Sequence, residues 1–404
     1  MSDAAVPAAT PPSFPFPTVS SLEPTQEYAR LREEQPVVRV TLPSGDLAWL
    51  VTRHEDVRLV FSDPRFSRAA ASRPGAPRLM PGVEGDPESI VSKDPPDHTR
   101  LRKLVSPAFT ARRMEDMRPR IRATAAHLLD EVEQAGPPAD LVAAFFSQLP
   151  MIVICDLLGI PDGDREKFRA WSSAMFSVTP STLKAGLEAR NALIAYMGSL
   201  VEAKRAAPSD DLLGVLIAHH DEGDRLSDRE LVSFAGGLLV AGYETTSNRL
   251  ATTVLMLLRR PDQLALLQAD EELLSNAVEE ALRYVSGGAA GGFMRVAAVD
   301  VELRGVTIRA GDGVIAVTGS ANRDPDAFPD PDRFDITRAP GPHTTFGHGI
   351  HHCVGAQLAR IELQEGLREL FRRFPRLHLA VSEAELAWRK NVVIQSLLSM
   401  PVTW

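Results

Sequence analysis

The sequence predicts a mainly α-helical protein with small antiparallel β-sheets, folded as a single domain over residues 18–404. Apolar residues recur at helical spacing through most of the stretch from Asp97 to about Arg260. One helix in this stretch begins after Ser227 and meets no proline until Pro261. Alternating apolar residues between Val299 and Val317, interrupted by glycines, indicate short strands. Together these observations favour a helical body with peripheral sheets.

Composition sets the broad class. The chain has 404 residues and is 44% hydrophobic, and because proteins of this size bury about three quarters of their unfolded surface, it can enclose a large cofactor. A net charge of -9 without a basic tail disfavours bulk nucleic-acid binding. Two cysteines, Cys155 and Cys353, form no disulfide framework and suit a reducing compartment. Since no signal peptide and no run of ~20 apolar residues is recognisable, we expect a cytosolic protein. We also expect it to be a monomer.

The first elements along the chain are an N-terminal segment, a hairpin and a long loop. Residues 1–17 are rich in Pro and Ala, and we expect them to be poorly ordered until they pack on the body. The apolar runs 37–42 and 47–52 flank a Pro-Ser-Gly-Asp turn and predict a β-hairpin. Residues 73–87 are rich in Gly and Pro, which predicts a functional or mobile loop.

The later elements include the long helix. Ser227 and Glu230 form a capping box at its start, and the helix should run for about 30 residues, or ~45 Å. A second helix should end near Tyr284, followed by the short strands and by a final helix that begins just after Cys353.

The segment around Cys353 carries the most chemical information. It reads Phe346-Gly-His-Gly-Ile-His-His-Cys353-Val-Gly355. Its three glycines allow tight turns and the close approach of another body, and the helix that follows directs free N–H groups and its positive end toward the sulfur. A flat apolar ligand could lie against the Phe346 face. The alternative for a lone cysteine at such a boundary is a buried or capping thiol.

This segment resembles the cysteine-ligand loop of the cytochrome P-450 family, which reads Phe-x-x-Gly-x-(Arg or His)-x-Cys-x-Gly. The resemblance implies that Cys353 is the axial ligand of haem b and that its thiolate donates electron density to the iron. It also implies that Phe346 shields the sulfur. His351 stands where the family most often has Arg, and a histidine there would make its contact with a haem propionate sensitive to pH.

A second motif lies in the long helix and reads Ala241-Gly242-Tyr-Glu244-Thr245-Thr246. By itself it could be a surface Glu-Thr pair on an ordinary helix. It is similar to the family's dioxygen-binding helix, which implies that Ala241 and Gly242 lie beside haem and O₂. Thr245 would then hydrogen-bond the activated oxygen, and Glu244 would help to deliver protons through water, which general acid catalysis requires.

Two further constellations fit the family by their order in the chain, so that the four motifs span residues 97–355. Glu280 and Arg283 match a buried Glu-x-x-Arg with a structural role, and Arg333 is expected to be their third partner, although such i,i+3 pairs are usually solvated. The resemblance assigns the haem propionates to three cationic or donor side chains, because buried carboxylates need such partners: His98, Arg102 and Arg295.

The substrate pocket is predicted from a run of small residues. Residues 287–292 are all Gly or Ala, which leaves space for a bulky substrate in the upper part of the usual ~300–1,000 Å³ range; the alternative is a flexible connector. We expect the pocket to be lined by Leu238, Ala290, Gly292, Phe293, Val393 and Ile394.

The resemblance implies a monooxygenase that hydroxylates or epoxidises a bulky apolar molecule, such as a polyketide or macrolide of secondary metabolism. Electrons would come from NAD(P)H through a ferredoxin and a ferredoxin reductase. Two alternatives stay open: a peroxide-driven peroxygenase and a haem sensor without turnover. The ferredoxin would dock near the cysteine on a basic patch, for which we expect Arg100, Arg112, Arg113 and Arg360.

Overall fold

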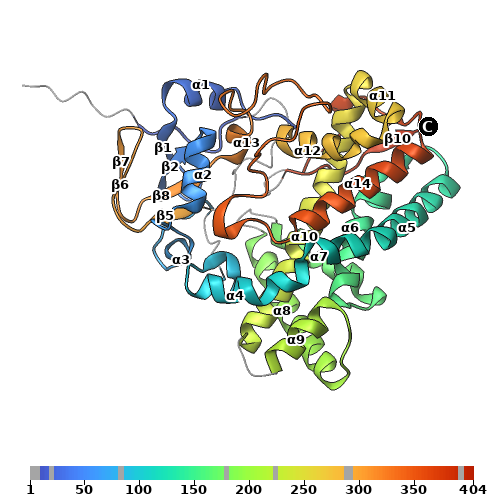
Figure 1. Ribbon diagram of the computed structural model, residues 1–404, viewed down its shortest axis with the longest axis horizontal. Helices are drawn as coiled ribbons and strands as arrows, with labels where there is room; N and C mark the ends of the chain where they lie inside the picture. Colours follow the sequence, from blue (N-terminus) through green and yellow to red (C-terminus); the bar gives the residue numbers. More distant parts are fainter. Residues whose placement is uncertain are drawn as a thin grey trace, which may run out of the picture.

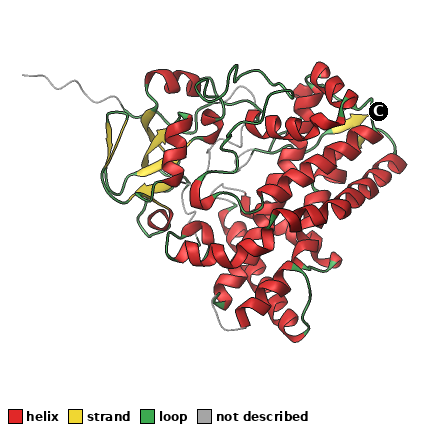
Figure 2. Cartoon of the chain, viewed as in Figure 1, coloured by secondary structure: helices red, strands yellow, loops and turns green. Residues whose placement is uncertain are grey.

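Helices fill most of the molecule, and most of the strands gather at one end of it (Figures 1 and 2). This computed structural model describes residues 10–17, 22–80, 86–176, 182–221, 226–285, 294–389 and 395–404. The helical class with small sheets, predicted from the sequence, is confirmed.

The long helix α10 (Asp228–Leu258) runs through the middle of the fold (Figure 1). Its 31 residues span about 46 Å at 1.5 Å per residue. The predicted capping box is present: the Ser227 hydroxyl accepts the Glu230 N–H at 3.1 Å, and the Glu230 carboxylate accepts the Ser227 N–H at 2.8 Å. Residues 250–257 are buried all round, so neighbouring helices rather than amphipathicity stabilise the second half of α10.

Two hydrophobic clusters share α10. The first packs its second half against α5 (Ala111–Ala135), α6 (Gln148–Leu158), α12 (Leu274–Tyr284) and α14 (Ala356–Arg373). The second packs its first half against α6, α7 (Arg165–Phe176), α8 (Leu183–Ala206) and α9 (Leu212–Asp221). The smaller helices are α1 (Glu27–Glu34), α2 (His54–Ser62), α3 (Arg68–Ala71), α4 (Asp97–Val105), α11 (Pro261–Ala269) and α13 (Thr318–Ala321).

The main sheet has five strands in the order β1-β2-β8-β5-β3. They are β1 (Val37–Thr41), β2 (Leu47–Val51), β3 (Phe66–Ser67), β5 (Arg295–Ala297) and β8 (Gly313–Ala316). The predicted hairpin is confirmed as β1 and β2, which pair antiparallel with Val37 opposite Val51. One pairing differs from the expected antiparallel pattern, since β8 runs parallel to β2.

The remaining strands form two small sheets. Two of the predicted short strands, β6 (Val301–Leu303) and β7 (Val306–Ile308), pair antiparallel. The other sheet consists of β4 (Ala139–Asp140), β10 (Pro401–Thr403) and β9 (His378–Leu379). Part of the N-terminal segment packs on the body, because Phe14 and Phe16 are buried against β1 and β2. No helix among the described residues is long and apolar enough to cross a membrane.

Candidate active site

The cysteine loop approaches α2 and then enters α14. Gly347 and Gly349 have φ angles of +75° and +72°, which L side chains rarely adopt. A Cβ on Gly349 would lie 2.7 Å from the Phe61 carbonyl oxygen, so only glycine fits where the loop meets α2. The Cys353 N–H donates to the Phe346 carbonyl at 2.9 Å and closes the loop. These glycines thus allow the tight turn of the loop and its close approach to α2, as expected from the sequence.

The Cys353 thiol keeps solvent-accessible surface although protein atoms crowd around it. Burial raises its pKa, while a hydrogen bond from the Gly355 N–H and the charges of Arg102 and Arg360 act in the opposite direction. The N-terminus of α14 therefore favours the thiolate but does not outweigh burial. A metal ion would reverse this balance, because a coordinating thiol is deprotonated.

A half-buried ion-pair cluster, which the sequence did not predict, holds the ring of Phe346. The Arg360 guanidinium lies 4.6 Å from the ring centroid and pairs with Glu279 at 2.6 Å. His343, from the same loop as Phe346, also contacts Glu279, at 3.1 Å. Although burial acts to raise it, these two partners lower the pKa of Glu279 to about 2. The cluster fixes α12, α14 and the cysteine loop to one another.

The four residues expected at the haem propionates come together from three elements. The rings of His98 (α4) and His351 (η6, Gly349–His351) are 4.3 Å apart. Burial, and then the charges of His98, Arg295, Arg68 and Arg102, lower the pKa of His351 to about 3. Arg102 also acts on Cys353, so this basic cluster lies beside the thiol.

This basic cluster fits the propionate end of a haem. His98 Nδ1 and His351 Nε2 are buried and have no hydrogen-bond partner among the described residues. Burial, followed by the charge of Arg68, lowers the pKa of Arg295 to about 9. Cations and donors gathered at such a cost suit an anion, and the two propionates of a haem bound beside the Cys353 thiol would supply it.

The motif in α10 presents two different faces. Ala241 and Thr245 are exposed although they lie in the middle of a central helix, and the Thr245 hydroxyl donates to the Ala241 carbonyl at 2.6 Å. Glu244 is 6% exposed and faces another side. Gly242 has a packing role, since a Cβ there would meet the Ile154 side chain of α6 at 3.1 Å. The position of Gly242 beside O₂, which the resemblance implies, stays a prediction.

Glu280 and Arg283 form the expected buried pair, with Arg283 Nε 2.8 Å from Glu280 Oε2. The prediction that Arg333 is the third partner is wrong, because its side chain is 68% exposed and lies 3.6 Å from Asp335. Arg338 takes that place, 3.2 Å from Glu280. Arg333 contributes only its carbonyl, which accepts from both Arg283 and Arg338.

Most of the predicted substrate pocket lies outside the described residues, namely Ala290, Gly292, Phe293, Val393 and Ile394. Leu238, one turn before Ala241 on α10, is buried in the cluster shared with α8.

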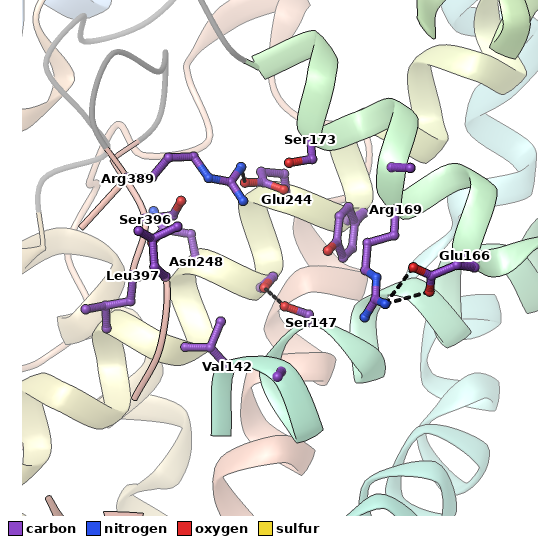
Figure 3. A pocket seen from close by; sticks show the side chains of 15 residues that line it. Val142, Ser147, Glu166, Arg169, Ser173, Glu244, Asn248, Arg389, Ser396 and Leu397 are labelled. Carbon is purple, nitrogen blue, oxygen red and sulfur yellow. Dashed lines mark hydrogen bonds and ion pairs between the residues drawn. The ribbon is translucent and has the colours of Figure 1, made fainter. Parts of the chain in front are cut away.

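Glu244 lines a polar cavity of about 350 Å³ between α7, α10, the short π-helix η3 (Val142–Phe146) and the chain near Arg389 and Ser396 (Figure 3). Arg389 Nη1 lies 2.9 Å from Glu244 Oε1. Burial raises the pKa of Glu244, and Arg389 opposes the rise. Sequence reasoning missed Arg389 because no pattern links it to a partner 145 residues earlier.

The arginines expected at a docking patch differ in their surroundings. Arg100 pairs with Glu230 and Arg360 with Glu279. Arg112 and Arg113 are exposed in the first turn of α5. That turn lies near Cys353, because Glu115 accepts a hydrogen bond at 2.9 Å from Gln357, in the first turn of α14.

Comparisons with known proteins agree with this geometry. A family model described as Cytochrome P450 matches residues 14–393. The chain is 47% identical to the mycinamicin IV hydroxylase/epoxidase of Micromonospora griseorubida, covering 98% of this chain and 100% of that protein. It is 49% identical to the nocardicin C N-oxygenase of Nocardia uniformis subsp. tsuyamanensis, over 97% and 98% of the two chains. The crystal structure of HinD with NMFT and NO superposes with a TM-score of 0.93 at 46% identity, over 98% and 100%.

Proposed function

The chain belongs to the cytochrome P450 family and is a monooxygenase, and we propose that it inserts one oxygen atom from O₂ into a bulky apolar small molecule. The family implies a haem cofactor, a redox partner and a small-molecule substrate. The observation that carries the proposal is the accessible thiol of Cys353 beside four converging cationic or donor side chains.

The cofactor is proposed to be haem b, with Cys353 on the iron and His98, Arg102, Arg295 and His351 at the propionates. Haem held by these residues would supply the chemistry of O₂ activation, in which two electrons and two protons are consumed, one oxygen atom enters the substrate and the other becomes water. The Gly355 N–H stabilises the sulfur as a thiolate. The Phe346 ring, held by Arg360, covers the loop that carries the Cys353 sulfur.

Thr245 and Glu244 are proposed to handle the two protons that this reaction consumes. Because the Thr245 hydroxyl gives its hydrogen to the Ala241 carbonyl, its lone pairs are free to accept a hydrogen bond on the accessible face of α10. Burial raises the pKa of Glu244, so this carboxyl holds a proton at a higher pH than an exposed glutamate does, which suits a group that takes up and releases protons.

We propose that the substrate is a polyketide- or macrolide-like secondary metabolite of antibiotic biosynthesis, hydroxylated or epoxidised. The name of the Micromonospora relative, mycinamicin IV hydroxylase/epoxidase, supports this. The proposal also follows the sequence-based expectation that residues 287–292, which are all Gly or Ala, leave room for a bulky substrate. Electrons are proposed to reach a monomeric enzyme from NAD(P)H through a ferredoxin reductase and a ferredoxin.

The test combines binding and isotope labelling. Macrolides and polyketides are first screened for a shift of the haem spin state, and a hit is then incubated with ferredoxin, reductase, NADPH and ¹⁸O₂. We expect one labelled oxygen in the product. Label that enters only from H₂¹⁸O₂ would favour the peroxygenase alternative, and binding without any product would favour a haem sensor.

A further inference from the structure

The polar cavity beside Glu244 is lined by exposed side chains of α7 and by buried side chains of α10 (Figure 3). At its rim, Glu166 is 76% exposed and pairs with Arg169 at 2.6 Å. At its floor lie Glu244, Asn248 and Ser396, each more than nine-tenths buried. The cavity therefore leads from solvent to the carboxyl group of Glu244.

Two of these floor residues need partners that the described protein does not provide. Asn248 Oδ1 and Ser396 Oγ are buried without a hydrogen-bond partner among the described residues. Buried polar atoms are nearly always hydrogen-bonded, and a polar cavity of about 350 Å³ holds several water molecules. Water is thus the expected occupant.

Arg389 is held in the cavity by its own backbone. Its N–H donates to the Ser396 carbonyl at 2.7 Å, and the neighbouring residues Trp388 and Leu397 form an antiparallel bridge. The backbone pairing that anchors Arg389 therefore also positions Ser396. The Arg389 side chain then reaches Glu244 at 2.9 Å.

The position of Asn248 links the cavity with the accessible face of α10. It lies four residues after Glu244 and three after Thr245, so its side chain is a neighbour of both on the helix surface. The cavity itself is lined by α10 residues on the Glu244 side and not by Thr245.

We propose that this cavity is the proton-entry chamber of the enzyme and that Arg389 is the positioning residue that holds Glu244 in it. This inference deepens the proposed function and rests on it. A proton arrives from bulk water, an O–H bond forms on the Glu244 carboxylate, and the ion pair with Arg389 is released. Glu244 then gives the proton toward Thr245 and returns to Arg389, so that charge balances over each cycle.

The charges around Glu244 suit this role. Among the described residues that line the chamber, the ionisable groups are Tyr243 and Glu244 on α10, Glu166 and Arg169 on α7, and Arg389. Glu166 and Arg169 neutralise each other, and burial raises the pKa of Tyr243, which stays a neutral phenol. Arg389 is therefore the charge that controls the Glu244 carboxyl.

The first experiment follows Glu244 directly in the resting, haem-loaded protein. The infrared band of its protonated carboxyl is assigned by its loss in Glu244→Gln and titrated with pH. Arg389→Gln should raise the pKa of Glu244 by ~1–3 units, the usual effect of one close opposite charge. Arg309→Gln, an exposed arginine paired with Asp300 on the sheet side, is the matched control. An unchanged titration in Arg389→Gln overturns the role of Arg389.

The second experiment fills the chamber without touching Glu244. Ser173→Leu on α7 and Ser247→Leu on α10 each replace a small lining residue by a larger apolar one, and Ser173→Ala is the control. Each leucine variant should slow H/D exchange of the Glu244 carboxyl in D₂O on the order of tenfold and raise the solvent isotope effect on product formation. Exchange as fast as in Ser173→Ala would mean that protons enter elsewhere. If the wild type forms no product, the proposed function fails, while the infrared measurements still decide the inference.

Discussion

Cys353 and Cys155 have the same side chain in opposite environments. Cys155 is fully buried on α6, where burial raises the pKa of its thiol to about 12 and its sulfur lies 3.6 Å from that of Met151. Cys353 is accessible, and although burial raises the pKa of its thiol as well, the Gly355 N–H and two arginines oppose this rise. The reactivity of a thiol depends on these surroundings, and of the two cysteines only Cys353 is in an environment suited to binding a metal.

We therefore predict that Cys353→Ser removes the red-shifted absorption of the reduced carbon monoxide complex, because a serine hydroxyl is not a thiolate donor. Cys155→Ser is the matched control and should keep the band. Both variants are measured at equal haem content. Persistence of the band in Cys353→Ser, or its loss in Cys155→Ser alone, would contradict the ligand assignment.

Thr245 and Thr246 are neighbours with different exposure. Thr245 is on the accessible face of α10, and Thr246 is 4% exposed. We predict that Thr245→Ala still binds haem and substrate and consumes NADPH, but releases more of the electrons as hydrogen peroxide, since protonation is no longer directed. The ratio of product to NADPH is the measurement, and Thr245→Ser should restore most of it. A ratio unchanged in Thr245→Ala would exclude the role.

For single residues, the sequence correctly predicts the contacts of side chains that belong to motifs and misses the contacts of side chains in loops. His98 and His351 come together as expected because each sits in a segment whose order matches a known family. Arg333 and Arg338 lie five residues apart in an irregular segment, where spacing does not fix side-chain direction. Arg389 has no motif at all, and its role depends on a contact between distant segments.

Among the elements, the cysteine loop depends on the pairing of α12 with α14 through Glu279. Hydrogen bonds from His343 and Arg360 bring the pKa of Glu279 from 4.5 to about 2 despite burial. A lowered carboxylate pKa stabilises the fold fully above pH 4.5, and this contribution is lost as the pH falls toward 2.

We predict that Glu279→Gln lowers the midpoint of thermal unfolding of the haem-loaded protein at neutral pH, and that the difference from wild type shrinks below pH 4.5. Glu166→Gln, which breaks an exposed pair, should change the midpoint little at any pH. A Glu279→Gln deficit that is independent of pH would show that the ionised carboxylate is not the stabilising form.

Element prediction succeeds where local signals are strong. The capping box and the absence of proline define α10, and the turn residues define the β1–β2 hairpin. The parallel pairing of β8 with β2 could not be predicted, because alternation along a strand does not specify its partner.

For the whole molecule, the arrangement of α5 and α14 decides which surface a redox partner meets. The two helices lie side by side (Figure 1). Gln357, four residues after Cys353, contacts Glu115, and this contact places the first turn of α5 beside the start of α14. Of the four arginines expected on this face, Arg100 and Arg360 are engaged in ion pairs. Arg112 and Arg113 are therefore the two exposed arginines of this set whose charge would steer an approaching redox partner.

We predict that Arg113→Glu slows reduction by an acidic ferredoxin on the order of tenfold at low salt, because the reversed charge repels the approaching partner. Raising the ionic strength should reduce the difference, since the Debye length falls to ~8 Å at physiological salt. Stopped-flow reduction of the haem measures the rate, with Arg309→Glu as a charge-matched control on the β6–β7 side of the molecule. If Arg113→Glu and Arg309→Glu slow reduction equally, the effect is one of net charge. If neither salt nor Arg113→Glu changes the rate, association does not use this surface, and the donor approaches Cys353 from another side.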